Sequence, residues 1–349
     1  MSEVLEGRRM SDQEFAFLFE HGDLLELGQA ACQARDKIFQ DDLITFIIDR
    51  NINYTNICSC QCKFCAFYRR KTDPDAYVID KATLFGKIME AMQLGATQIM
   101  LQGGLNEDLH IDFFEDMFKE IKTRYGLTLH SLSAPEVVFI AKNSDLTIAD
   151  TLLRLKKAGL DSLPGGGAEI LHDEVRAQIS PNKVNTATWL EVMRTAHRLG
   201  LKSTATMMMG TVETLEQRIA HLREIRALQD ETNGFRAFIA WTYQPGNNEL
   251  RGKKMSSSLY LRFLALSRLY LDNFDHIQGS WVTQGERIGQ MTLYFGADDL
   301  GSLMLEENVV RAAGLHYQMH INSMLDLIRG TGRTPALRDT AYEVLRVFD

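Results

Sequence analysis

The sequence predicts an α/β fold, a (β/α)8 barrel of the TIM type, on three observations. Short apolar runs alternate with amphipathic helical patterns at spacings of roughly 30 residues, which is typical of right-handed βαβ units around a parallel sheet. Roughly seven or eight such units can be counted, as a closed barrel requires. The chain of 349 residues contains no proline-rich or serine-rich linker, and barrels of this size commonly fold as one unit.

The first predicted element is a helical preface over residues 10–40, where Phe15, Leu18 and Leu25 recur at helical spacing. From residue 43 a strand-like run leads into a group of cysteines. Each later predicted strand is a short apolar run that ends in a polar or glycine-rich turn. These runs lie at residues 97–104, 127–134, 161–167, 202–210, 235–246, 276–283 and near 293–299.

Helical patterns lie between these strands, and several of them end at a glycine, which is a common helix terminator. They cover residues 81–95, 111–126, 148–159 and 186–200, and the pattern after about residue 304 is helical to the end. We therefore expect a helical preface at 1–41, a barrel at 42–304 and a C-terminal helical extension at 305–349 that packs on the barrel.

Composition and charge favour a soluble enzyme that acts on small molecules. Hydrophobic residues make up 45 % of the chain and charged residues 24 %, which is ordinary for a globular protein. The formal charge of −8 provides no basic field for nucleic acid, so we expect a small-molecule substrate and no nucleic-acid partner. The N-terminus lacks the apolar core of a secretion signal, and no stretch is apolar enough to span a membrane, so we expect a cytoplasmic protein without a membrane partner.

Four of the five cysteines fall within residues 58–65, which indicates metal binding or redox chemistry and not a disulfide framework. Cys58, Cys62 and Cys65 have the spacing C-x3-C-x2-C directly after a predicted strand. Three thiolates can bind three irons of a cubane [4Fe–4S] cluster and leave the fourth iron open for a substrate. Cys60 is interpreted as a small buried thiol. The alternative is a four-cysteine zinc site that includes Cys60, although zinc sites usually use two pairs on separate turns.

The cysteine segment, followed by Ala66, Phe67 and Tyr68, resembles the signature of the radical S-adenosylmethionine superfamily. The resemblance extends over about residues 42–310, and this part of the chain is most similar to the futalosine-pathway and deazaflavin-precursor branch of the superfamily. It is carried by residues 51–56, 162–169, 241–247 and 280–285. The resemblance implies a [4Fe–4S] cluster, S-adenosylmethionine and a 5′-deoxyadenosyl radical able to remove hydrogen from an unactivated carbon.

Within this branch, the last two segments are most similar to members that cyclise dehypoxanthine futalosine in menaquinone biosynthesis. That implies abstraction of a ribose hydrogen from a nucleoside-like substrate, closure of the sugar radical onto the attached ring, and loss of one electron and one proton. It also implies an external electron donor such as flavodoxin or ferredoxin. Synthesis of aminofutalosine, or the tyrosine-using step of deazaflavin-precursor synthesis, is the nearest alternative. A non-catalytic zinc or iron–sulfur protein is a remote one.

The resemblance also implies residues that bind S-adenosylmethionine, at the strand ends where barrels gather their sites. Backbone groups of Gln102, Gly103 and Gly104 would bind the methionine ammonium, although Leu105 replaces the glutamate common in the superfamily, and a plain turn is the alternative. Glu169 would bind the ribose or amine and Arg176 the carboxylate, the alternatives being charged positions of a helix. Tyr68 resembles an aromatic that packs near the adenine, with a core position as the alternative.

Five polar residues at predicted strand ends are candidates for holding the substrate. Any one of them could instead satisfy buried backbone groups. The five are His130, Tyr243, Gln244, Thr283 and Gln284.

Overall fold

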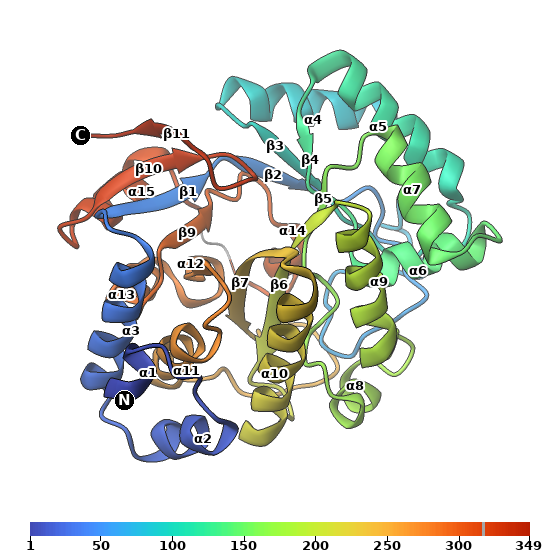
Figure 1. Cartoon of the computed structure of the whole chain (residues 1–349). Helices are drawn as coiled ribbons and strands as arrows, with labels where there is room; N and C mark the ends of the chain where they lie inside the picture. Colours follow the sequence, from blue (N-terminus) through green and yellow to red (C-terminus); the bar gives the residue numbers. More distant parts are fainter. Residues whose placement is uncertain (316–317) are drawn as a thin grey trace.

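Parallel strands form the centre of the computed structural model, which describes residues 1–315 and 318–349 (Figure 1). Strand β1 (Leu43–Ile47) belongs to an eight-stranded sheet of order β11-β10-β1-β9-β8-β7-β6-β5, and β2 (Asp49–Ile52), which follows at once, belongs to the sheet β2-β3-β4. A bridge between His130 and Ser162 links β4 to β5. The strands from β1 to β9 therefore close into a ring, and the predicted α/β barrel is confirmed.

The other barrel strands are short, apart from two central ones. They are β3 (Gln98–Leu101), β4 (Thr128–Leu129), β5 (Ser162–Leu163), β6 (Lys202–Met209), β7 (Phe235–Thr242), β8 (His276–Gln278) and β9 (Asp299–Ser302). All of their ladders are parallel, and β6 pairs with β7 from Ser203↔Phe235 to Met209↔Thr242. In such a ring the carboxyl ends of all strands open at one face.

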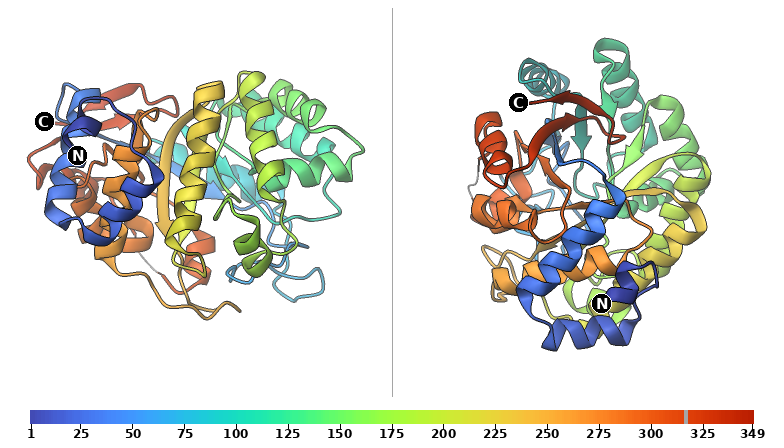
Figure 2. Two further views of the ribbon diagram at one scale, coloured as in Figure 1. Left: turned by 60° about the horizontal axis from the view of Figure 1, so that its bottom comes forward. Right: turned by 60° about the vertical axis from the view of Figure 1, so that its left-hand side comes forward.

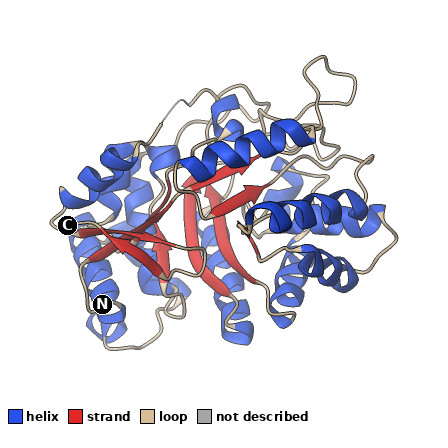
Figure 3. Cartoon of the chain, turned by 90° about the horizontal axis from the view of Figure 1, so that it is seen from above, coloured by secondary structure: helices blue, strands red, loops and turns tan. Residues whose placement is uncertain are grey.

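Helices surround the strands on the outside (Figure 3). Those between the barrel strands are α4 (Lys81–Gln93), α5 (Ile111–Tyr125), α6 (Ala134–Asn143), α7 (Ile148–Ala158), α8 (Asp173–Ile179), α9 (Thr186–Arg198), α10 (Leu215–Thr232), α11 (Ser257–Tyr270), α12 (Trp281–Gln284) and α13 (Glu286–Thr292). None of the helices in the described parts of the chain has the length and apolar character needed to cross a membrane.

Three helices precede the barrel: α1 (Ser2–Leu5), α2 (Asp12–His21) and α3 (Leu24–Ile38). Ser11 and Glu14 form a capping box at the start of α2, which satisfies its first free N–H groups. The buried ring of Phe15 meets Phe263 and Tyr270 of α11 edge-on, with centroids 5.7 and 5.6 Å away. These helices lie on the outside of the barrel (blue in Figure 2).

The C-terminal region differs from the expected helical extension. Helices α14 (Asn308–Ala312) and α15 (Ile321–Arg329) are present, but they are followed by strands β10 (Thr334–Arg338) and β11 (Val344–Val347). Strand β10 runs parallel to β1, and a bidentate ion pair joins it to β9, with Arg338 Nε 2.6 Å from Asp299 Oδ2 and Nη2 3.1 Å from Oδ1. The prediction of an entirely helical C-terminal region was therefore wrong. Pairing with β1 gives the short segment of β10 an extended conformation. The domain boundaries at residues 41 and 304 stay predictions.

Candidate functional site

A cavity of about 440 Å³ lies inside the barrel. Its lining includes the loop with Cys58, Cys62 and Cys65, which follows β2, and Arg236, which lies near the amino end of β7. The cavity therefore reaches from the carboxyl-end loops into the barrel interior. Enclosed, mostly apolar cavities with a few convergent polar groups are the usual form of a small-molecule site.

The cysteine loop is fixed by backbone hydrogen bonds to neighbouring elements. Ser59 N donates to Leu105 O, 3.0 Å away after β3, and Lys63 N donates to Ile179 O, 2.9 Å away at the end of α8. A Cβ on Gly104 would lie 2.1 Å from the carbonyl oxygen of Ile57, so only glycine permits this close approach. The loop is thereby held at the carboxyl ends of the strands, where a site was predicted from the sequence.

All four clustered cysteines line the cavity. Cys60 Sγ lies 3.5 Å from Cys62 Sγ. The hydrogen bond from Cys60 lowers the pKa of Cys62 to about 7, the same bond raises that of Cys60, and burial raises that of Cys65 to about 11. Among the described residues no three Cys, His or acidic side chains converge closely enough to hold a metal ion as they stand. The loop fits a cluster by the chemistry of its donors, which are three soft sulfurs on one segment facing one cavity.

A buried ion pair lies beside the cysteines. Glu169 Oε1 is 2.8 Å from Lys183 Nζ, with only 6 % and 11 % of the side chains exposed, and both residues line the cavity. Lys183 Nζ also lies 5.1 Å from the ring centroid of Phe64. Burial alone would lower the pKa of Lys183, but Cys62 and Glu169 outweigh it and raise that pKa. Glu169 thus lines the same cavity as the cysteines, and its role toward S-adenosylmethionine stays a prediction. Lys183 was not among the predicted residues.

Arg176 lies elsewhere and needs a correction. It does not line the cavity, and its guanidinium donates to the backbone carbonyls of Gly167, Ala168, Ile170 and Val184. All of its nitrogens are thereby occupied in holding the loop after β5 against α8. The expected contact with a carboxylate of S-adenosylmethionine therefore does not fit this side chain, whose role is to fix the loop that carries Glu169.

The other residues expected to bind S-adenosylmethionine line the cavity. Gln102, Gly103 and Gly104 follow β3, and all three N–H groups already donate, to Ile52 O, Glu136 Oε1 and Thr55 O. Because Gln102 O accepts from Asn53 Nδ2 at 3.1 Å, the carbonyl oxygens of the two glycines are the backbone groups left for a ligand. Tyr68 lies on the cysteine loop and donates to Glu249 Oε1 at 3.2 Å. Their roles stay predictions.

Four of the five predicted substrate residues line the cavity: His130, Tyr243, Gln244 and Thr283. Burial lowers the pKa of His130 to about 3, so its ring is neutral, with Nδ1 2.7 Å from Ser162 Oγ. Tyr243 donates to Asn248 Oδ1 at 2.6 Å. Gln284 lies outside the lining and donates to Thr242 Oγ1 at 2.6 Å, so its side chain satisfies a neighbouring strand end instead of facing a substrate.

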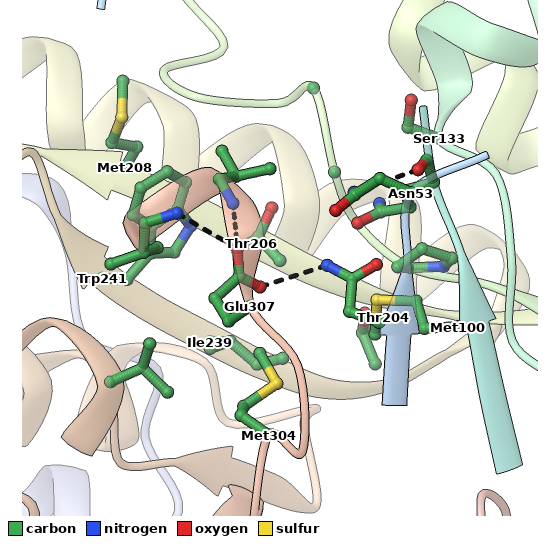
Figure 4. Close-up of a pocket in the computed structure, with 18 of the residues that line it drawn as sticks. Asn53, Met100, Ser133, Thr204, Thr206, Met208, Ile239, Trp241, Met304 and Glu307 are labelled. Atoms are coloured by element: carbon green, nitrogen blue, oxygen red, sulfur yellow. Dashed lines mark hydrogen bonds between the residues drawn. The ribbon is translucent and has the colours of Figure 1, made fainter. Parts of the chain in front are cut away.

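Several residues that line the cavity were not predicted from the sequence. Figure 4 shows Glu307 at the centre of the pocket, between Trp241 and Met208 on one side and Asn53 and Ser133 on the other. In β2 and its flank, Asp49, Asn51 and Asn53, which line the cavity, alternate with Arg50, Ile52 and Tyr54, which do not. That alternation, polar toward the interior, is a signal that could have identified the asparagines. Glu307 lies in the region expected to be a helical extension packed on the barrel, where no sequence pattern pointed to the cavity.

Comparison with known proteins gives consistent matches along the chain. The family model of the Radical SAM superfamily matches residues 52–225, and that of the CofH/MqnC C-terminal region matches residues 232–349. Two relatives are named cyclic dehypoxanthine futalosine synthase. The one from Halalkalibacterium halodurans is 42 % identical over 100 % of this chain and 95 % of its own, and the one from Streptomyces coelicolor is 46 % identical over 98 % and 87 %.

A third relative, from Archaeoglobus fulgidus, is named 5-amino-6-(D-ribitylamino)uracil–L-tyrosine 4-hydroxyphenyl transferase. It is 40 % identical over 93 % of this chain and 96 % of its own. Among solved structures, methylornithine synthase aligns with a TM-score of 0.75 over 96 % of both chains at 20 % identity. The hydrogenase maturase HydG aligns with a TM-score of 0.74 over 98 % of this chain and 75 % of its own at 15 % identity. These two structures support the fold.

Proposed function

Because this chain belongs to the radical S-adenosylmethionine superfamily and is an enzyme of that kind, we propose that it converts dehypoxanthine futalosine to cyclic dehypoxanthine futalosine in menaquinone biosynthesis. The observation that carries the proposal is the likeness, over nearly the whole length, to two synthases of that name at 42 % and 46 % identity. The transferase from Archaeoglobus fulgidus, at 40 %, supports the tyrosine-using reaction as the second candidate.

The geometry of the cavity supports radical chemistry of this type. Cys58, Cys62 and Cys65 would hold a [4Fe–4S] cluster, which with S-adenosylmethionine would supply a 5′-deoxyadenosyl radical. Glu169, fixed by Lys183, offers a carboxylate beside this loop for the hydroxyl or amino groups of S-adenosylmethionine. The barrel walls shield the interior from water, which would otherwise intercept reactive species.

We expect dehypoxanthine futalosine deuterated in its ribose to transfer the label to 5′-deoxyadenosine. The substrate loses one hydrogen atom in this step and afterwards one proton and one electron, the electron passing to a one-electron carrier of the flavodoxin or ferredoxin type. The cyclised product should therefore be two hydrogens lighter than the substrate. Anaerobic turnover with S-adenosylmethionine and a reductant, followed by mass spectrometry of both products, measures this.

Tyrosine with 5-amino-6-(D-ribitylamino)uracil is the matched control reaction. The proposal predicts no coupled product from that pair. Turnover of tyrosine, combined with no cyclisation of dehypoxanthine futalosine, would replace the proposed function by the second candidate.

A further inference from the structure

Asn51 lines the cavity and carries a hydrogen-bond acceptor without a partner among the described residues. Its side chain, on β2, is 4 % exposed, and its Nδ2 donates to Glu307 Oε2 at 3.1 Å. Its Oδ1 is buried and has no hydrogen-bond partner among the described residues. Exchanging the two amide atoms would turn the oxygen toward the carboxylate, so the orientation follows from the chemistry of Glu307. A buried amide oxygen without a partner costs free energy, which indicates that a ligand completes it.

Glu307 is fixed next to Asn51 by the start of α14. Its Oε1 accepts from the N–H groups of Val309 at 2.9 Å and Val310 at 3.1 Å. A carboxylate has about four acceptor positions, and these two bonds with the bond from Asn51 use three. Burial raises the pKa of Glu307, which agrees with a carboxylate that lacks a full set of partners. One acceptor position of Glu307 therefore remains for the cavity, which Asn51 also lines.

We propose that Asn51 and Glu307 form a subsite that accepts hydrogen bonds from hydroxyl groups in the sugar-derived part of the substrate. Two adjacent acceptors require a ligand with adjacent donors, and neighbouring hydroxyls on a sugar provide them. An anionic group is excluded, because Glu307 would repel it. The choice of a sugar rests on the proposed function, in which the ribose is the part of the substrate that reacts.

The position of the subsite in the chain gives it a mechanistic consequence. Asn51 lies on β2, and the same segment continues directly into the loop that begins at Cys58. Hydrogen abstraction requires the reacting carbon and the radical centre to be held near contact distance. A sugar bound to Asn51 would lie in the same cavity that the cysteine loop lines, where the radical would form. Asn51 and Glu307 are thus positioning residues.

Binding to the anaerobic holoenzyme, loaded with cluster and S-adenosylmethionine but without reductant, tests the subsite. Isothermal calorimetry would compare dehypoxanthine futalosine with its 2-deoxy and 3-deoxy analogues. For the unmodified protein we expect at least one deoxy analogue to bind about tenfold more weakly. The ratio of the dissociation constant of a deoxy analogue to that of the parent compound is called the deoxy penalty. Asn51→Ala should weaken binding of the parent compound by a similar factor and reduce the deoxy penalty to less than about twofold. The hydroxyl and the amide of Asn51 are partners in one hydrogen bond, so removing the second partner after the first costs little more.

Glu307→Gln provides a second variant, which keeps the size of the side chain and should also reduce the deoxy penalty. The control is Asn143→Ala, whose amide donates to the carbonyls of Glu107 and Leu109 outside the cavity lining, and which should leave the penalty unchanged. An unchanged deoxy penalty in both Asn51→Ala and Glu307→Gln would overturn the subsite and indicate that only water fills it.

Other ligands separate the subsite from the proposed function. If dehypoxanthine futalosine does not bind but 5-amino-6-(D-ribitylamino)uracil binds in a way that depends on Asn51, the subsite stands and the proposed function fails. If dehypoxanthine futalosine binds and cyclises without dependence on Asn51, the function stands and the subsite is refuted. Binding of tyrosine through Asn51 would show recognition of an ammonium group and would also refute the subsite.

Discussion

Alanine at Cys58, Cys62 or Cys65 is expected to abolish cleavage of S-adenosylmethionine, whereas Cys60→Ser should keep most of it. Each alanine would remove one of three cluster ligands, and a cubane held by two thiolates loses iron. Serine at position 60 retains a donor of similar size, so it can still donate to Cys62, whose sulfur lies 3.5 Å from that of Cys60. Iron and sulfide analysis after anaerobic reconstitution, with quantification of 5′-deoxyadenosine, measures both effects.

Cys32→Ser is the matched control, because Cys32 lies on α3 outside the barrel cavity, with its thiol 3.6 Å from the carbonyl oxygen of Leu293. This variant should retain about four irons, as a cubane requires. Loss of the cluster in Cys60→Ser, combined with its retention in Cys62→Ser, would contradict the ligand assignment. Protein that takes up only zinc after the same reconstitution would remove the basis for a radical enzyme.

The barrel could be predicted from the sequence because its strands and helices alternate with a regular period. The predicted runs 127–134 and 161–167 do contain β4 and β5, although the observed ladders span only two residues each. Strand β10 was missed for a different reason. Its five residues, Thr334–Arg338, contain a proline and carry no distinct alternation, and their extended state depends on pairing with β1, almost 300 residues earlier.

The candidate site was predictable where one short segment carries the chemistry. Cysteine spacing identified the loop, and resemblance placed Glu169 beside it. Lys183 could not be found in this way, because its contact with Glu169 forms only when the chain after α8 folds back. Arg176 shows the opposite error, since its charge suggested a ligand carboxylate but its partners are backbone carbonyls. Side-chain type gives the chemistry that is available, and only the fold determines the partner.

The buried pair of Glu169 and Lys183 leads to the second large expected effect, a loss of about 3–5 kcal/mol in the free energy of unfolding for Lys183→Met. Methionine keeps the apolar stem of lysine, so the change removes chiefly the charge and, with it, the cation–π contact of Nζ with Phe64. It leaves the carboxylate of Glu169, with 6 % of the side chain exposed, without its cation. Chemical denaturation of the cluster-free protein under anaerobic conditions measures this loss.

Two further variants separate the ion pair from a general effect of mutation. Glu169→Gln combined with Lys183→Met should recover much of the lost stability, since no uncompensated charge remains, and the resulting coupling energy isolates the pair. Lys119→Met is the matched exposed control, because Lys119 is 56 % exposed and its nitrogen lies 3.5 Å from Glu115, and it should cost less than about 1 kcal/mol. A cost for Lys183→Met as small as that of the control would mean that water already screens Glu169. In that case the carboxylate would not depend on Lys183 for its place beside the cysteine loop.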